Sequence, residues 1–204
     1  MGPRLRNRDH ELIQIVDAAL AEAARQSGPW LACKPGCTQC CVGPFAINAL
    51  DVARLRAGWR ELRKTDPQRA REVKKRAEAS VGRLAKDYPG DPLSGMLDSG
   101  EEAERKFAAF ANDEPCPALD PHTGLCDLYE SRPMTCRIFG PPVRSAEGIA
   151  VCELCFQGTS KAQILSCEMI PDPGGLEEKI LQELESRSGA GGETIVAFCL
   201  AHAR

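Results

Sequence analysis

Cysteine is the residue type in this chain with the most capacity for chemistry, with eleven in 204 residues. A core of this size needs no disulfide staples, and an odd total excludes complete internal pairing. The N-terminal residues are basic without an apolar segment behind them, and no run of eighteen apolar residues occurs. We therefore expect a cytoplasmic chain that does not enter a membrane. Because cytoplasmic thiols stay reduced, the cysteines favour metal binding over structural disulfides.

Four of the cysteines lie within nine residues, at Cys33, Cys37, Cys40 and Cys41. Thiolates at such spacings converge on a metal ion or cluster when a tight turn points their side chains inward. Adjacent side chains usually diverge, so the Cys40–Cys41 pair predicts two centres, or one centre with a spare thiol beside it. The first three cysteines also fit radical S-adenosylmethionine enzymes, but Gln39 replaces the usual aromatic residue and no alternating βα units follow.

A second set of cysteines follows in three short elements, Cys116-Pro-Ala-Leu119, Cys126-Asp-Leu-Tyr129 and Arg132-Pro-Met-Thr-Cys136-Arg137. Together with residues 33–41, these elements in this order closely resemble the YkgJ-like cysteine-cluster family, a zinc- or iron-chelating domain. The resemblance spans residues 33–137, and Cys155 matches a further cysteine that often follows in this family. It implies eight metal ligands: Cys33, Cys37, Cys40, Cys41, Cys116, Cys126, Cys136 and Cys155.

The three remaining cysteines are Cys152, Cys167 and Cys199. Cys152 precedes Cys155 in a C-x2-C spacing and is an alternative to one of the eight. Cys167 and Cys199 fall outside the family pattern, and we expect them to be small buried apolar side chains. His122 lies between Cys116 and Cys126, where we expect an exposed loop residue rather than a ligand.

The identity of the metal stays open between an iron–sulfur cluster and Zn²⁺. Eight thiolates suit two four-cysteine sites. Zinc fingers pair two C-x2-C elements separated by 15–20 residues, whereas the two cysteine sets here lie much farther apart. Iron–sulfur clusters tolerate C-x3-C spacing and remote ligands, so we favour a cluster. Around the ligands, Arg132, Arg137 and Tyr129 are expected to tune the metal or to fix the surrounding turns.

The rest of the chain predicts a mainly α fold, a helical frame that carries cysteine-rich loops and at most a short β-hairpin. We expect helices at 9–26, 48–64, 67–87, from a capping box at Ser99–Glu102, and near 159–167 and 175–187. A hairpin is expected between 137–143 and 148–152, turning at 145–148. We treat 1–204 as one domain with its core motif at 33–155 and a helical extension at 176–204.

Two functions from different classes fit these patterns. The first is a metal-binding protein that carries an iron–sulfur cluster, zinc or both, with a redox or electron-transfer role and a protein partner. The second is a non-catalytic interaction module stabilised by zinc. The family resemblance adds an accessory protein similar to lysine N-methylases. Residues 60–76 are basic and 98–114 acidic, but the chain has a net charge of −3, so we expect no nucleic-acid partner.

Overall fold

The computed structural model describes residues 1–145, 148–189 and 191–203. Its contacts divide the chain into two compact units. Unit 1 comprises Met1–Pro35 and Met134–Gly189, and unit 2 comprises Gly36–Pro133 and Ala190–Arg204. Among the described residues, helices predominate and the strands form only short antiparallel pairs. The predicted mainly α class is therefore confirmed. Within that described part, no helix is both long enough and apolar enough to cross a membrane.

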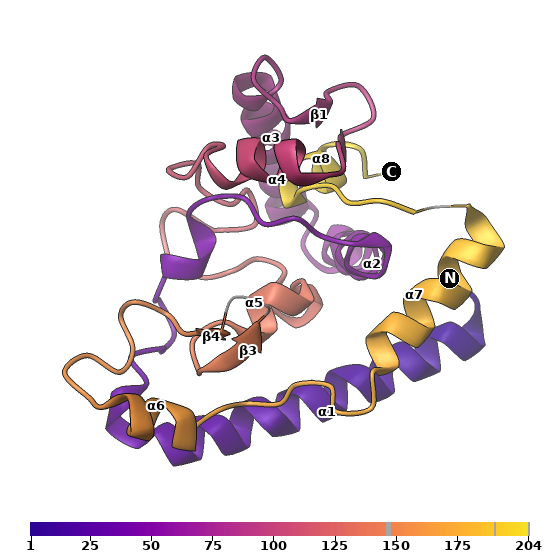
Figure 1. The fold of residues 1–204 in the computed structure, drawn as a ribbon. Coiled ribbons are helices and arrows are strands. Elements are labelled where there is room, and N and C mark those ends of the chain that lie inside the picture. The colour runs from indigo at the N-terminus through magenta and orange to yellow at the C-terminus, as the bar shows by residue number, and fades with distance from the viewer. Residues whose placement is uncertain (146–147, 190, 204) are drawn as a thin grey trace. The chain divides into compact units, whose positions relative to one another are not determined.

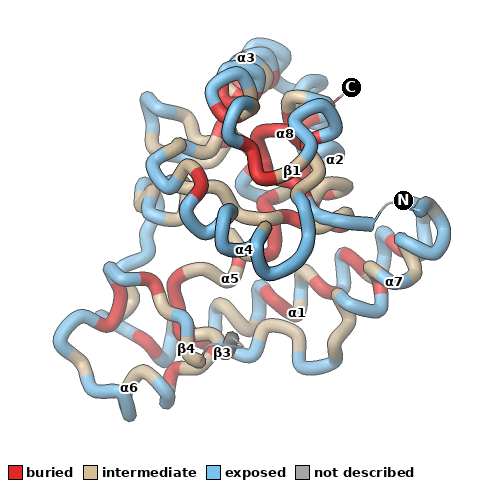
Figure 2. Tube along the Cα trace, turned by 45° about the horizontal axis from the view of Figure 1, so that its top comes forward, coloured by how far each residue is buried: buried red, intermediate tan, exposed pale blue. Residues whose placement is uncertain are grey.

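Unit 1 is built on the long helix α1 (Pro3–Ser27), which begins six residues before the expected start. Pro3 occupies the first turn, where a missing N–H costs nothing. Leu5 extends the apolar stripe of Leu12 and Val16, and all three are buried. Buried positions recur along the length of α1 (Figure 2). The helix ends at Gly28, whose φ of +51° suits glycine, and continues into the short helix η1 (Gly28–Trp30).

Two further helices of unit 1 pack on α1 (Figure 1). They are α5 (Met134–Ile138) and α7 (Leu176–Ser188), and α6 (Lys161–Ser166) lies between them in sequence. The predicted hairpin is confirmed in shorter form as β3 (Val143–Ser145) against β4 (Gly148–Ala150). The two central residues of its turn, 146 and 147, lie outside the described residues.

Unit 2 has its core between α2 (Ala49–Thr65), α3 (Pro67–Leu84) and α8 (Val196–Ala201). Asn48 accepts hydrogen bonds from two N–H groups at the start of α2, and Asp66 caps α3, as their sequence positions predict. The apolar tail of the chain covers the core of its own unit, because Leu200 is fully buried there. Trp59 lies in the same cluster and donates a hydrogen bond to the Ala70 carbonyl.

The remaining elements of unit 2 are short. They are η2 (Gln39–Cys41), β1 (Gly90–Asp91), β2 (Met96–Leu97), α4 (Glu101–Ala108) and η3 (Tyr129–Ser131). The expected capping box at Ser99 is wrong, because Gly100 is the N-cap of α4 and makes no side-chain cap. Three glutamates in the first turn of α4 stabilise that helix end through its dipole instead. The β1–β2 pair was not anticipated from the sequence.

Candidate metal centre

The cysteines of the chain are distributed over both units. Unit 1 contains Cys33, Cys136, Cys152, Cys155 and Cys167, and unit 2 contains Cys37, Cys40, Cys41, Cys116, Cys126 and Cys199. The eight cysteines implied by the family resemblance therefore divide into three in unit 1 and five in unit 2. None of the eleven, all of which lie in the described part of the chain, forms a disulfide. Each unit thus has its own group of thiols, which we call the unit 1 cysteines and the unit 2 cysteines.

Backbone pairing brings the unit 2 cysteines together from distant parts of the sequence. The Cys116 N–H donates to the Cys41 carbonyl over 2.7 Å, and Val42 forms a β-bridge with Pro115. Leu119 forms a second bridge with Cys126. These two bridges place the segments that carry Cys41, Cys116 and Cys126 side by side, although 75 residues separate the first two.

The thiols of Cys40 and Cys41 interact with each other, contrary to the expectation that this adjacent pair diverges. Both cysteines lie in the short helix η2. A hydrogen bond from the Cys41 thiol lowers the pKa of Cys40 to about 6, and the same bond raises the pKa of Cys41. Burial raises the pKa of Cys116 to about 12, and that of Cys126 is also raised by burial. These four thiols feel one another's charge, so they form one electrostatic group.

Cys37 is placed differently from these four. It is half-buried in the loop before η2, and its neighbours Gly36 and Thr38 lie beside Gly124. It therefore lies on the side of the turn at residues 120–125.

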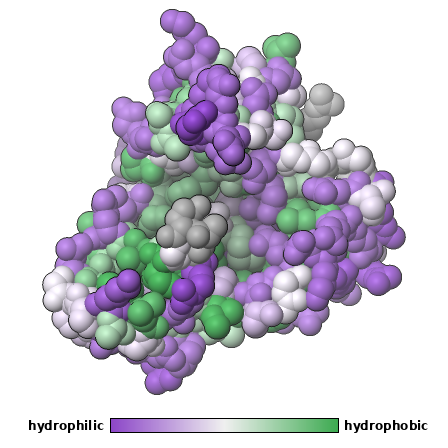
Figure 3. Space-filling model, viewed as in Figure 1, coloured by the Kyte–Doolittle hydropathy of each residue, from purple (hydrophilic) through white to green (hydrophobic). Residues whose placement is uncertain are grey.

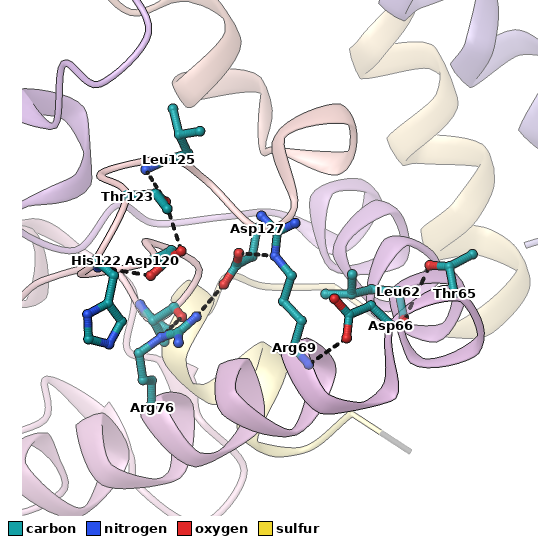
Figure 4. Close-up of polar contacts among 11 residues, drawn as sticks. Leu62, Thr65, Asp66, Arg69, Arg76, Asp120, His122, Thr123, Leu125 and Asp127 are labelled. Atoms are coloured by element: carbon teal, nitrogen blue, oxygen red, sulfur yellow. Dashed lines mark hydrogen bonds and ion pairs between the residues drawn. The ribbon is translucent and has the colours of Figure 1, made fainter.

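Two arginines of α3 fix the loops that carry Cys116 and Cys126 (Figure 4). The Arg69 Nε and the Arg76 Nη2 each donate to the Asp127 carboxylate, whose side chain is 2% exposed. The Arg76 Nε also donates to the Pro117 carbonyl over 2.9 Å. A single guanidinium thus joins the residue after Cys116 to the residue after Cys126.

This pair of arginine contacts was missed from the sequence, where residues 60–76 were noted only as a basic stretch. The only sequence signal was Asp127 directly after Cys126, which is not specific. The turn before it is fixed locally, because Asp120 accepts from the His122 N–H over 2.9 Å and from the Thr123 hydroxyl over 2.8 Å. The His122 side chain is exposed on this turn (Figure 4).

Arg132 and Tyr129 belong to unit 2 and lie beside its thiols. The charge of Arg132 contributes to lowering the pKa of Cys40 and opposes the burial that raises the pKa of Cys126. The guanidinium is buried, donates to the Tyr129 carbonyl over 2.9 Å and lies 3.8 Å from the centre of the Tyr129 ring. Tyr129 therefore positions a cation next to the thiols by stacking and by its backbone.

Arg137 is in unit 1, where its side chain reaches α1. It is 3% exposed and donates to the Asp17 carboxylate over 2.9 Å. Because Arg137 directly follows Cys136 on α5, this ion pair fixes the segment that carries that cysteine to α1. The three side chains predicted to support the metal thus serve two different units.

Three of the unit 1 cysteines, Cys152, Cys155 and Cys167, are buried in an apolar cluster, and Cys33 lies at its edge. The Sγ atoms of Cys33 and Cys155 are 4.0 Å apart. Cys152 and Cys155 are both buried, and the Cys155 N–H donates to the Cys152 carbonyl over 2.9 Å. Gly140 lines the same place, because a Cβ there would lie 2.7 Å from the Cys33 Sγ. The apolar side chains packed around this cluster are Leu31, Phe139, Val151, Phe156 and Ile164.

The cysteines outside the family pattern are buried, as Cys167 and Cys199 were expected to be. Cys167 packs in the unit 1 cluster, where Gln163 and Ser166 of its own helix contact its sulfur at 3.7 and 3.8 Å. Cys199 lies in the α2–α3–α8 core, and its sulfur contacts the Val52 carbonyl at 3.9 Å. Neither needs a metal to explain its position.

The donor chemistry of both groups fits a thiophilic metal. Each group brings several thiols together, and thiolates select zinc and iron–sulfur clusters over hard cations. Among the described residues, no three Cys, His, Asp or Glu side chains are already closed around one point at metal-ligand spacing. The thiols of each group lie near one another in an open arrangement.

The comparison with family models gives one match, to the CxxCxxCC model, described as "Putative zinc- or iron-chelating domain", over residues 32–156. The match covers more than half of the chain and includes all eight cysteines implied by the resemblance, together with Cys152. No curated protein and no solved structure matches the chain. The extent of the family match and the clustered thiols together show that the chain belongs to the CxxCxxCC family of zinc- or iron-chelating domains.

Proposed function

We propose that the chain holds an iron–sulfur cluster through cysteine thiolates and exchanges electrons with a protein partner in the cytoplasm. The proposed metal ligands form two separate groups. In unit 2 they are Cys37, Cys40, Cys41, Cys116 and Cys126, and in unit 1 they are Cys33, Cys136 and Cys155. Membership in a zinc- or iron-chelating family supports metal binding. The iron–sulfur cluster and its redox role go beyond what family membership implies.

The observation that carries this proposal is the environment of the unit 2 thiols. Four of them share one electrostatic group, and the buried Arg132 guanidinium lies within reach of its charge. A thiolate-bound cluster carries negative charge, and a fixed cation beside it favours the more negative, reduced state. The unit 2 thiols are half-buried, so an electron partner can approach them.

The second candidate is a non-catalytic module whose zinc ties loops together. Its support is the pair Cys33 and Cys155, whose Sγ–Sγ distance of 4.0 Å suits two ligands of one ion. Zinc has no accessible redox change, so a zinc-only protein would carry no electrons.

One purification separates the two candidates. The protein is isolated under strict anaerobic conditions, and iron, zinc and acid-labile sulfide are measured together with the visible spectrum before and after dithionite. We expect iron and sulfide in equal amounts and a broad absorbance that bleaches on reduction. A colourless protein with stoichiometric zinc supports the interaction module instead. A metal-free protein that stays folded in chelator contradicts both.

A further inference from the structure

Unit 1 has one pattern cysteine too few for a metal site with four protein ligands. Only Cys33, Cys136 and Cys155 of the eight pattern cysteines lie in unit 1. A closed structural site for a thiophilic ion takes four protein ligands in a tetrahedral arrangement. A further thiol from the same unit is therefore needed, and the candidates are Cys152 and Cys167.

These two cysteines differ in how they are connected to the Cys33–Cys155 pair. Cys152 is joined to Cys155 by the backbone hydrogen bond of a tight C-x2-C turn, the spacing at which two thiolates bind one ion. Its own N–H points to the Gly140 carbonyl at 3.4 Å, and Gly140 borders the Cys33 sulfur. Cys152 is thus connected to both members of the Cys33–Cys155 pair.

Cys167 lies in the same cluster but its sulfur has other partners. The Gln163 amide and the Ser166 hydroxyl contact it from the preceding turn of α6. These contacts give the Cys167 sulfur the neutral hydrogen bonds of a buried thiol. Cys167 is therefore the natural control for Cys152, since both are buried cysteines of one cluster.

The distance between Cys33 and Cys155 bears on how many metal atoms the site takes. Two thiolates on one tetrahedral ion, each about 2.3 Å from the metal, are separated by about 3.8 Å. The observed Sγ–Sγ separation is 4.0 Å. The four cysteines of a [4Fe–4S] cluster each bind a different iron and lie farther apart, so the Cys33–Cys155 pair fits two ligands of one metal atom.

The fourth cysteine, Cys136, lies on α5. That helix ends at Ile138, and the next two residues both border the cluster: Phe139 packs against it, and Gly140 lies against the Cys33 sulfur. The Arg137–Asp17 ion pair fixes this segment to α1. The carrier segments of all four cysteines thus meet within unit 1.

We propose that Cys152 joins Cys33, Cys136 and Cys155 to bind one tetrahedral divalent ion of the zinc type in unit 1, a site separate from the redox cluster of unit 2. This inference rests on the proposed function insofar as the cysteines bind metal. The inference goes beyond the proposed function in three ways: Cys152 is a ligand, Cys167 is not, and unit 1 binds a single ion. The unit 1 ion then has a structural role, because four thiolates leave it no open coordination position. Apolar side chains also pack around Cys152 and Cys155.

The test uses the full chain as wild type, Cys152→Ser and Cys167→Ser, purified anaerobically so that iron and sulfide can be counted in each. Zn²⁺ is then removed from the unit 1 site with a mild chelator and replaced by Co²⁺, whose absorption bands report thiolate number and tetrahedral geometry. We expect one Co²⁺ with a tetrathiolate spectrum in the wild type and in Cys167→Ser. In Cys152→Ser we expect at least a tenfold weaker Co²⁺ affinity, with iron and sulfide unchanged.

A second variant covers the case in which the buried Cys152 position does not tolerate serine. Cys33 is exposed, so Cys33→Ser places no new polar group in the core and should lose the same Co²⁺ spectrum. Retention of a tetrathiolate spectrum in Cys152→Ser, or its loss in Cys167→Ser, overturns the assignment. Iron uptake by a wild type that gives no cobalt–thiolate spectrum overturns the unit 1 site alone. Failure to take up either metal overturns the proposed function as well.

Discussion

The two cysteine groups of this protein differ in what surrounds the sulfur atoms. In unit 1, Cys152, Cys155 and Cys167 are buried among apolar side chains, and Cys152 and Cys155 are each only 4% exposed, whereas Cys33 is exposed. The five pattern cysteines of unit 2 are half-buried, and the Arg132 guanidinium and the ion pairs of Asp127 lie beside them. Apolar packing is thus the main feature around the first group, and charge is the main feature around the second.

This difference separates two metal functions. An apolar shell penalises any change in charge, so it suits an ion whose oxidation state stays fixed. A fixed cation and partial exposure lower the cost of adding an electron and admit a partner. The exposed surface near the unit 1 cysteines is itself partly apolar, with Trp30, Leu154 and Leu165 exposed, and apolar surface is visible around α6 (Figure 3). We therefore propose that the metal of unit 1 has a structural role and that the metal of unit 2 transfers electrons.

Metal removal should produce the largest effect and should test whether the two units depend on metal in the same way. We expect chelation under reducing conditions to raise amide exchange by ~100-fold or more in residues 36–43, 114–127 and 139–156, because bound metal closes these loops. Helices α2, α3 and α8 should keep their protection, since their contacts involve fully buried apolar side chains such as Val73 and Leu200. Hydrogen exchange measured by mass spectrometry compares the two states, with metal-reconstituted protein as control.

Uniform exchange over the whole chelated chain would contradict this expectation. It would mean that the core of unit 2 also needs metal to fold. If the cysteine loops of both units lost the same amount of protection while the helices kept theirs, the two metal sites would not differ in how enclosed they are.

Gly140→Ala should affect unit 1 alone. Gly140 has φ of +125°, a conformation that alanine adopts only with a strain of about 1–3 kcal/mol, and the new Cβ would lie 2.7 Å from the Cys33 sulfur. We expect loss of the unit 1 ion and a lower melting temperature, with iron and sulfide of unit 2 unchanged. The matched control is Gly124→Ala in unit 2, where φ is +68° and the nearest atoms are 3.8 Å away. Full metal content in Gly140→Ala would show that Cys33 is not a ligand.

The long helices were predictable from the sequence because each part of the signal is local. Apolar spacing, Asn48 and Asp66 as caps, and Gly28-Pro29 as a stop define α1 to α3 within a few residues. The cysteine pattern predicted metal binding, and the family match supports it. In physical terms, these features depend on neighbours along the chain and not on the final packing.

The distribution of cysteines over two units was not predictable in the same way. It depends on long-range pairings such as Val42 with Pro115, which leave no periodic signal in the sequence. Asp127 is one carboxylate among many in the sequence, and only the fold shows that Arg69 and Arg76 meet at it. The assignment of ligands to each site remains a proposal that the variants decide.

Arg76→Gln should weaken the unit 2 site and spare unit 1. Arg76 holds the loop after Cys116 through the Pro117 carbonyl and the loop after Cys126 through Asp127, so its loss lets the two cysteines separate. We expect metal affinity in unit 2 to fall about 10–100-fold, as when other supports of metal ligands are removed. Titration with iron and sulfide, followed by visible absorbance, measures this loss.

The control for Arg76→Gln is its neighbour Lys75→Gln, since Lys75 is exposed and only pairs with Glu72 at 3.5 Å. Arg76→Lys should restore little, because one ammonium lacks the planar fork that reaches two acceptors. If Arg76→Gln lowered only the melting temperature and left metal affinity unchanged, the arginine would stabilise α3 without positioning the ligands.

Tyr129→Leu should give the smallest effect and addresses how each unit holds its arginine. In unit 1, Arg137 is held by the Asp17 carboxylate, whereas in unit 2 Arg132 is held by the Tyr129 ring and backbone carbonyl. An exposed cation–π contact contributes about 0.5–1 kcal/mol, so the free energy of unfolding should fall by no more than this. The midpoint potential of the unit 2 centre should nevertheless move to a lower value, because Arg132 can then turn away from the thiols. Tyr129→Phe keeps the ring and should keep the potential; an unchanged potential in Tyr129→Leu would show that the backbone carbonyl alone holds the cation. Such a result would make the charge beside unit 2 as fixed as the ion pair in unit 1, and solvent access would then be the main difference between the sites.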